Sequence, residues 1–359
     1  MQLQFLRGSA SLREACCWKT IIPRDMERAP DSRPPHHGPD GKFRIPWPVE
    51  GGERRTQLQL LQWMGERFLR GRPPNPKPGD LPMARPEIAS PRANGGEIRI
   101  TWVGHSTFLI QAGAVNILTD PHWSLRASPS QRFGPARFVP PAIAWEALPP
   151  IDAVLLSHDH YDHLDEDTVR RLHERFGVAL RWVTPLKYAE WFARLGIHGI
   201  TELDWWDEAE LPGGVRVTCA PAQHWTRRTM REMNDRLWAS FALRLPDGRG
   251  IYFAGDSGYF GGYGEIARRA GPFDVVLMPV GAYDPRWFMK PAHMNPEEAV
   301  RAYQDLGGRG AFVGMHWGTF RLTDEDPLEP PLRTRAAWSA AGLPAADLHL
   351  PLHGATIRL

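Results

Sequence analysis

The run Ser157-His158-Asp159-His160-Tyr161-Asp162-His163 follows directly on a short apolar segment at residues 153–156. Imidazole and carboxylate groups are ligands that suit Zn, Fe or Mn. In an extended segment His158 and His160 point to the same side, because side chains alternate with a period of two. A following turn can bring Asp162 and His163 to a second metal beside the first. The run therefore predicts half of a two-metal site at the end of a strand.

Further candidate ligands follow other apolar segments of the chain. His224 comes after residues 215–219, Asp256 after residues 251–253, and His316 after residues 311–314. The carboxyl ends of strands are where open α/β sheets assemble their sites. Any one of these residues alone would more often be an ordinary hydrogen-bonded loop residue. Together with the His-rich run they complete a predicted ligand set: His158, His160, Asp162, His163, His224, Asp256 and His316.

This ligand set favours hydrolysis. Two metals about 3.5–4 Å apart can share a carboxylate, here Asp256, and a bridging hydroxide, with the pKa of bound water lowered towards about 7. The hydroxide attacks a phosphoryl or carbonyl centre while the metals hold the developing negative charge. The sequence offers no convincing Ser/His/Asp or Cys/His arrangement as a rival. The residues alone leave phosphodiester, lactone and β-lactam hydrolysis open.

The chain divides into three predicted parts. Residues 1–55 are rich in Pro, Gly and charge, which predicts a poorly ordered segment with few side chains for a core. Within it Met26 is an alternative initiator to Met1, because the unusual Cys16-Cys17 stretch precedes Met26. Residues 56–95 predict a helix at 56–70 and then a Pro-rich linker. Residues 96–359 are predicted to form the hydrolase domain.

The predicted hydrolase domain alternates short apolar runs with helical patterns, which favours an α/β layered sandwich over a barrel of regular βα units. An N-cap is predicted at Asp165 or Asp167 for one helix and at Asn295 for another. The predicted strands are 97–103, 108–112, 115–118, 153–156, 215–219, 240–245, 251–253, 275–278 and 311–314, and the predicted helices are 165–175, 186–195, 262–270 and 296–306.

The composition argues against some classes of binding partner and cellular compartment. Lys+Arg number 43 against 41 for Asp+Glu, a balance that argues against a dominant nucleic-acid footprint. The spacing of Cys16, Cys17 and Cys219 suggests neither a disulfide framework nor a thiolate metal cage, which favours a reducing compartment. No apolar run approaches the roughly 20 residues of a spanning helix. We expect a cytoplasmic protein, with peripheral membrane contact and a homodimer left open.

The predicted helix at 56–70 has an apolar face made by Leu60, Leu61, Met64 and Phe68. Five arginines flank this face: Arg54, Arg55, Arg67, Arg70 and Arg72. Such a face either rests on an anionic bilayer or packs on the sandwich. Packing on the sandwich is the expectation.

The spacing of the ligand set resembles that of the metallo-β-lactamase superfamily of di-metal hydrolases, over about residues 96–359. Within the superfamily the chain is most similar to the N-acyl-phosphatidylethanolamine-hydrolysing phospholipases D. The segments that carry this similarity are 101–107, 118–121, 126–130, 149–154, 221–225, 281–289 and 316–320. The N-terminal segment departs from that pattern, which puts acyl-chain selectivity and membrane docking in doubt more than the chemistry.

The resemblance implies an αββα four-layer sandwich and two zinc ions, with Fe or Mn as alternatives. One zinc would be held by His158, His160 and His224, the other by Asp162, His163 and His316, and Asp256 would bridge them. It also implies a phospholipid substrate, N-acyl-phosphatidylethanolamine, cleaved to phosphatidic acid and an N-acylethanolamine.

Other residues take roles through the same resemblance. Asp162 and His293 are the candidate catalytic residues, and His293 would lie near the reacting phosphate. His105 and Asp120 are expected to support the ligands rather than bind metal. Four aromatic residues are candidates for substrate binding: Trp225, Tyr283, Trp287 and Phe288. Two other functions stay open, a hydrolase of a smaller soluble phosphodiester or lactone and a non-catalytic metal-binding scaffold.

Overall fold

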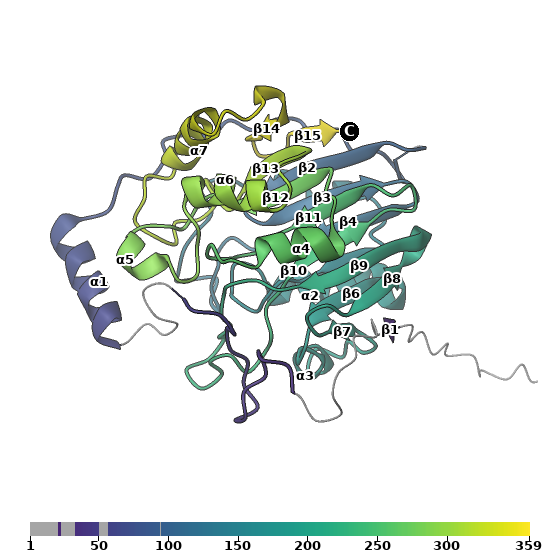
Figure 1. Ribbon diagram of the computed structural model, residues 1–359, viewed down its shortest axis with the longest axis horizontal. Coiled ribbons are helices and arrows are strands. Elements are labelled where there is room, and N and C mark those ends of the chain that lie inside the picture. Colours follow the sequence, from purple (N-terminus) through teal and green to yellow (C-terminus); the bar gives the residue numbers. More distant parts are fainter. Residues whose placement is uncertain (1–20, 23–32, 50–56, 94) are drawn as a thin grey trace, which may run out of the picture.

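Two mixed β-sheets with flanking helices make up the fold (Figure 1). The computed structural model describes residues 21–22, 33–49, 57–93 and 95–359, so Cys16, Cys17 and Met26 lie outside the described residues. One sheet has the order β1 (Ile21–Ile22), β8 (Glu208–Leu211), β9 (Val215–Ala220), β10 (Ser240–Arg244), β11 (Gly250–Phe253), β12 (Val275–Pro279), β13 (Ala311–Met315), β14 (Leu348–His349). The other has the order β15 (Thr356–Arg358), β2 (Ile98–Gly104), β3 (Thr107–Ala112), β4 (Val115–Thr119), β5 (Ala153–Leu155), β6 (Arg181–Pro185), β7 (Thr201–Leu203).

Each sheet is antiparallel on one side and parallel on the other. Strands β11 to β14 run parallel in the first sheet, and strands β4 to β7 run parallel in the second. Every residue of β5, β12 and β13 is buried, as expected for parallel strands that are covered on both faces. The carboxyl ends of parallel strands lie at one edge of a sheet, and the predicted ligands follow these ends.

All nine predicted strands are confirmed, with boundaries within one residue. Short elements without a readable period were missed: β6, β7, β8, β14 and β15. The sequence analysis also missed α7 (Glu329–Ala340), whose apolar residues do not gather on one face. Its two prolines are tolerated because they lie in the first turn, where backbone N–H groups have no partner within the helix.

The predicted helices α2 (Glu166–Phe176), α4 (Tyr263–Ala270) and α6 (Pro296–Asp305) are present within one residue of their predicted bounds. The helix predicted at 186–195 is shorter, as α3 (Ala189–Ala193), and a short α5 (Arg286–Met289) was not predicted. The N-cap at Asn295 is confirmed: its side chain accepts a hydrogen bond from the backbone N–H of Glu298. Asp165 occupies the N-cap of α2, but its side chain makes no hydrogen bond to the helix backbone. Its carboxylate accepts instead from the Ser124 and Thr168 hydroxyls.

Residues 33–49 correct the prediction that the first 55 residues supply few side chains to a core. Phe43 and Ile45 are buried in the main hydrophobic core. Trp47 stacks on Phe260 with ring centroids 4.4 Å apart. The prediction failed because a Pro-rich composition favours extended backbone but does not prevent single aromatic side chains from packing.

Helix α1 (Gln57–Arg70) is confirmed as a helix, but the expected packing of its apolar face is wrong. The exposed fractions of the four residues of that face run from 42% for Leu60 to 86% for Phe68. Helix α1 lies near α5 (Figure 1). It contacts the body through Trp63, which stacks on Phe288 of α5 with ring centroids 4.9 Å apart. Trp63 and Arg67 both bond to Asp324, at 2.5 and 2.7 Å.

Among the described helices, none has both the length and the apolar content that a membrane span requires.

Burial of Phe43 generates a prediction about stability. Because its ring is 3% exposed, Phe43→Ala should lower the free energy of unfolding by about 3–5 kcal/mol. The control Phe133→Ala makes the same change at a ring that is 75% exposed and should change stability by no more than about 0.5 kcal/mol. Urea denaturation followed by circular dichroism measures both. Equal effects of the two variants would contradict a packed role for residues 33–49.

Candidate metal centre

The predicted ligands follow strands of both sheets and lie close together at the carboxyl ends of these strands. The loop with His158 and His163 follows β5 of one sheet, whereas His224, Asp256 and His316 follow β9, β11 and β13 of the other. The site therefore spans the carboxyl ends of strands from both sheets. His316 has a positive φ of 65°, a conformation that costs energy for a residue with a side chain and that recurs at functional sites.

The first ligand group consists of His158, His160 and His224. The Nε2 atom of His158 lies 2.9 Å from Nδ1 of His160, and the Nε2 atom of His224 lies 3.2 Å from the same Nδ1. These three nitrogen atoms all lie within 4.8 Å of one another.

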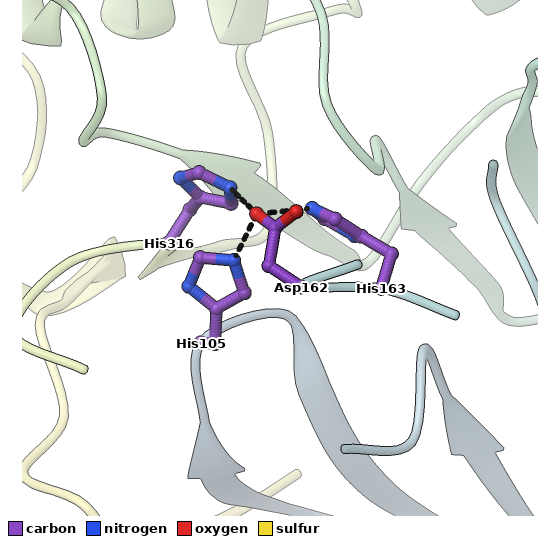
Figure 2. Close-up of side chains that lie close together, drawn as sticks. All are labelled: His105, Asp162, His163 and His316. Carbon is purple, nitrogen blue, oxygen red and sulfur yellow. Dashed lines mark hydrogen bonds and ion pairs between the residues drawn. The ribbon is translucent and has the colours of Figure 1, made fainter. Parts of the chain in front are cut away.

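The second group gathers around Asp162 (Figure 2). The Oδ2 atom of Asp162 lies 3.3 Å from Nε2 of His163 and 3.6 Å from Nε2 of His316. Asp256 lies between the two groups: its Oδ1 is 3.0 Å from Nε2 of His316, and its Oδ2 is 3.3 Å from Nε2 of His163 and 3.9 Å from Nε2 of His224. One carboxylate therefore faces both groups, in the position expected of a bridge.

Hydrogen bonds from outside orient the imidazole rings. Asp120 Oδ2 lies 2.6 Å from Nδ1 of His163 and also accepts from the hydroxyl of Ser157. That hydroxyl is 2.9 Å from Nδ1 of His158. The Nδ1 atom of His224 is 2.9 Å from the carbonyl oxygen of Ala292. In these three rings, His158, His163 and His224, Nδ1 is engaged and Nε2 faces the site, which is the usual support for metal-ligating histidines.

Burial and charge keep two rings of the first group neutral. Burial lowers the pKa of His158 well below its usual value, and repulsion from His163 and His160 adds to the effect. Burial, with repulsion from His160, lowers the pKa of His224 to about 3. Neutral imidazole is the form that binds a metal ion.

The second group is charged. Burial would raise the pKa of Asp162, but the charge of His163 and the hydrogen bond from His105 hold it well below its usual value. Burial of Asp256 is likewise outweighed, by the charges of His316 and His163. Attraction to Asp256 overcomes burial and raises the pKa of His316 to about 9, and the pKa of His163 is also raised. Two buried carboxylates thus stay ionised beside positive charge.

The donor set fits metal ions. Nε2 of His163, Nε2 of His316 and Oδ1 of Asp256 are buried without a hydrogen-bond partner among the described residues. Ligand atoms of a tetrahedral zinc with bonds of about 2.0–2.1 Å lie about 3.3 Å apart, close to the distances within both groups. A divalent cation would replace the protons on His163 and His316. The His and Asp clusters therefore indicate a binuclear metal site.

His293 lies beside the bridge position, in the connection between α5 and α6. Its Nδ1 is 3.7 Å from Oδ2 of Asp256, and its ring centroid is 5.1 Å from that of His224. Arg286 donates a hydrogen bond of 2.7 Å to the carbonyl oxygen of His293 and so fixes its backbone. The His293 side chain is partly exposed, which leaves it open to an incoming molecule.

The candidate substrate-binding aromatics do not all lie together. Trp225 contacts the site directly, with its ring centroid 4.4 Å from that of His160. Tyr283 is fully buried under the guanidinium group of Arg333 in α7, so its ring presents no surface to a substrate in this conformation.

Trp287 and Phe288 are on α5, next to α1. The ring of Phe288 is buried against Trp63, whereas Trp287 is exposed and meets Phe288 edge-on at 5.5 Å. Of the two, Phe288 packs against α1 through Trp63.

Asp159 was given no role in the sequence analysis, although it separates two predicted ligands. Its buried carboxylate accepts from the backbone N–H of Arg227 at 2.8 Å and from Arg236 at 3.0 Å. Arg228 donates to the carbonyl oxygen of Asp159 at 2.9 Å. These bonds tie the His-rich loop to the segment after His224. The position of Asp159 between two histidines was the one sequence signal for such a role. Its partners could not be recognised, because Arg227, Arg228 and Arg236 are distant from it in sequence.

This fold and this site define a class, the metal-dependent hydrolases of the metallo-β-lactamase fold. Residues 115–317, more than half of the chain, match the family described as Beta-lactamase superfamily domain. The chain belongs to this superfamily, and the resemblance found in the sequence is confirmed.

Relatives and solved structures agree with this assignment. An uncharacterized protein of Mycobacterium tuberculosis is 41% identical over 291 residues, which cover 79% of this chain and 74% of that protein. N-acyl-phosphatidylethanolamine-hydrolyzing phospholipase D 1 of Caenorhabditis elegans is 40% identical over 240 residues, which cover 64% of this chain and 67% of that protein. A metallo-β-lactamase fold protein of Bacillus subtilis superposes with a TM-score of 0.52 at 18% identity, over 73% of this chain and 100% of that chain, and shows the fold alone.

The two ligand groups generate a prediction about metal content. Wild-type protein loaded with zinc should hold two ions per chain, whereas His224→Ala and His316→Ala should each hold about one, because each loses a ligand of a different group. Mass spectrometry of metals after dialysis measures the content. His198→Ala removes an exposed histidine outside both groups and serves as the control. Equal metal content in His198→Ala and His224→Ala would refute the first group.

Proposed function

We propose that the protein is a zinc-dependent phosphodiesterase of the phospholipase D type, acting on N-acyl-phosphatidylethanolamine. The observation that carries the proposal is the pair of three-ligand groups that face each other across Asp256. The similarity to the Caenorhabditis elegans enzyme supports the choice of substrate. The products would be phosphatidic acid and an N-acylethanolamine.

In this proposal His158, His160 and His224 would hold one zinc ion and Asp162, His163 and His316 would hold the other, with Asp256 placed between the two groups. Two zinc ions bound there would neutralise the charge of a phosphodiester and lower the pKa of an attacking water. That chemistry needs no side-chain nucleophile.

The chain's own residues would bind and orient the substrate and move a proton. His293 lies beside Asp256 and is partly exposed, so it is placed to hydrogen-bond a phosphoryl oxygen. When the bond from phosphorus to the ethanolamine oxygen breaks, that oxygen needs a proton, and the imidazole of His293 is the candidate donor. Trp225 lines the site against His160.

An assay of substrates tests this function. Metal-analysed protein is incubated with N-acyl-phosphatidylethanolamine, phosphatidylcholine and bis(p-nitrophenyl) phosphate, and products are identified by mass spectrometry. Phosphatidic acid with N-acylethanolamine is the expected result, and Asp256→Asn should keep less than about 1% of the rate because it weakens both ligand groups. Turnover of the generic diester alone would replace the proposal with a soluble substrate. No turnover by protein holding two metals would favour a binding scaffold.

We also propose that α1 rests on an anionic lipid surface. Its apolar face, Leu60, Leu61, Met64 and Phe68, points away from the body and is exposed. Arg70 at the end of the helix is exposed as well, and Arg72 follows it. An apolar face bordered by arginines is the pattern of helices that lie in a membrane interface. Contact of α1 with α5 would then bring the lipid surface near the segment that leads to His293.

Co-sedimentation with phosphatidylglycerol vesicles tests the lipid contact. Wild-type protein should pellet with the vesicles, and Phe68→Asp should weaken binding at least about tenfold, because it removes a large apolar side chain and adds a negative charge. Val178→Asp places the same charge at another exposed apolar residue, away from α1, and should bind as wild type does. Unchanged pelleting of Phe68→Asp would remove α1 as the anchor.

A further inference from the structure

His105 stands at the turn between β2 and β3 with a positive φ of 55°. Left-handed backbone is uncommon for a residue with a side chain, and such residues cluster at functional sites. The pairing of β2 with β3 also shifts register between Trp102 and Gly104, directly before this residue. Bulges next to active sites re-aim a side chain. The hairpin thus departs from regular geometry twice, and both departures determine where the His105 side chain points.

Hydrogen bonds hold this conformation in place. The backbone N–H of His105 donates to Oγ1 of Thr319 at 2.7 Å. Its carbonyl oxygen accepts from the indole N–H of Trp102 at 2.8 Å and from the backbone N–H of His316 at 3.1 Å. Thr319 and His316 follow β13 of the other sheet, so the turn is fastened to the segment that carries a predicted ligand.

The imidazole of His105 is buried and points into the second ligand group. Its Nε2 lies 2.9 Å from Oδ2 of Asp162, closer than Nε2 of either His163 or His316. Its ring centroid is 3.9 Å from that of His316. Figure 2 shows His105 and His316 on one side of the Asp162 carboxylate and His163 on the other.

We propose that His105 is a positioning residue, whose Nε2–H donates to Oδ2 of Asp162 and holds that carboxylate in the orientation that completes the second ligand group. The inference rests on the metal sites of the proposed function. A carboxylate on a short side chain can turn about its last bond, and a fixed donor removes that freedom. Partners of this kind typically contribute 10–100-fold to metal affinity.

A purely structural role predicts a different outcome. If the ring only fills space between His316 and Phe320, whose centroid is 5.2 Å away, then phenylalanine at position 105 would replace it well. If the N–H is what matters, phenylalanine fails and glutamine, whose amide nitrogen can reach as far as Nε2, restores binding. Asparagine tolerates the left-handed backbone but is too short to reach Asp162.

The test compares His105→Phe, His105→Gln and His105→Asn in the full chain. Zinc affinity is measured by competition with a chelator, and the absorption spectrum of the cobalt-loaded protein reports the geometry of each site. We expect His105→Phe and His105→Asn to bind one of the two ions 10–100-fold more weakly and to change one cobalt band. His105→Gln should stay within a few-fold of wild type. Thermal melting in the presence of EDTA shows whether each metal-free variant folds.

Several results would overturn the inference. Wild-type affinity in His105→Phe would leave only a packing role, and equal weakening in His105→Gln and His105→Phe would show that the N–H is not what counts. Should His105→Phe fail to fold, wild-type zinc affinity in His105→Asn would overturn the inference in the same way. Wild-type protein that takes up fewer than two zinc ions would instead refute the metal sites themselves, a result that the wild-type titration identifies separately.

Discussion

Two carboxylates, the buried Asp256 and the mostly buried Asp162, impose the constraint on which the rest of this site depends. The imidazoles of His163 and His316 lie 3.0–3.6 Å from them and hold both in the ionised form. Ionised groups without water around them require compensating positive charge. Protons on His163 and His316 provide it in the metal-free protein, and a divalent cation would provide more of it. The concentration of negative charge, rather than the number of histidines, makes this edge of the two sheets a place for metal.

Support for these charges comes from residues outside the ligand set. Asp120 reaches His163 directly and His158 through Ser157. Asp120 itself has a positive φ of 34°, as His105 and His316 do. Backbone conformations that cost energy thus recur around the candidate metal centre, where the surrounding hydrogen bonds can maintain them. Most residues of the strands beneath are buried, and the three left-handed residues lie just beyond the ends of β2, β4 and β13.

Much of the fold could be predicted because its central strands are short, apolar and bounded by clear turn signals. Elements of two or three residues, such as β14, show no period and were missed. Helix α1 was predicted in the right place, but its packing was not, because an amphipathic pattern does not say what covers the apolar face. Phe43 shows the converse: one aromatic residue in a Pro-rich segment joined the core without any periodic signal.

For the candidate site, the sequence by itself determined the kinds of ligand and their order, since chemistry and spacing are local properties of the chain. It also indicated which strands the ligands would follow. Only the tertiary structure decided how closely Asp256 approaches both groups, that His105 reaches Asp162, and that Tyr283 is buried under Arg333. Those facts depend on how two sheets meet and on contacts between residues far apart in sequence. Periodicity and motif spacing carry no information about such distances.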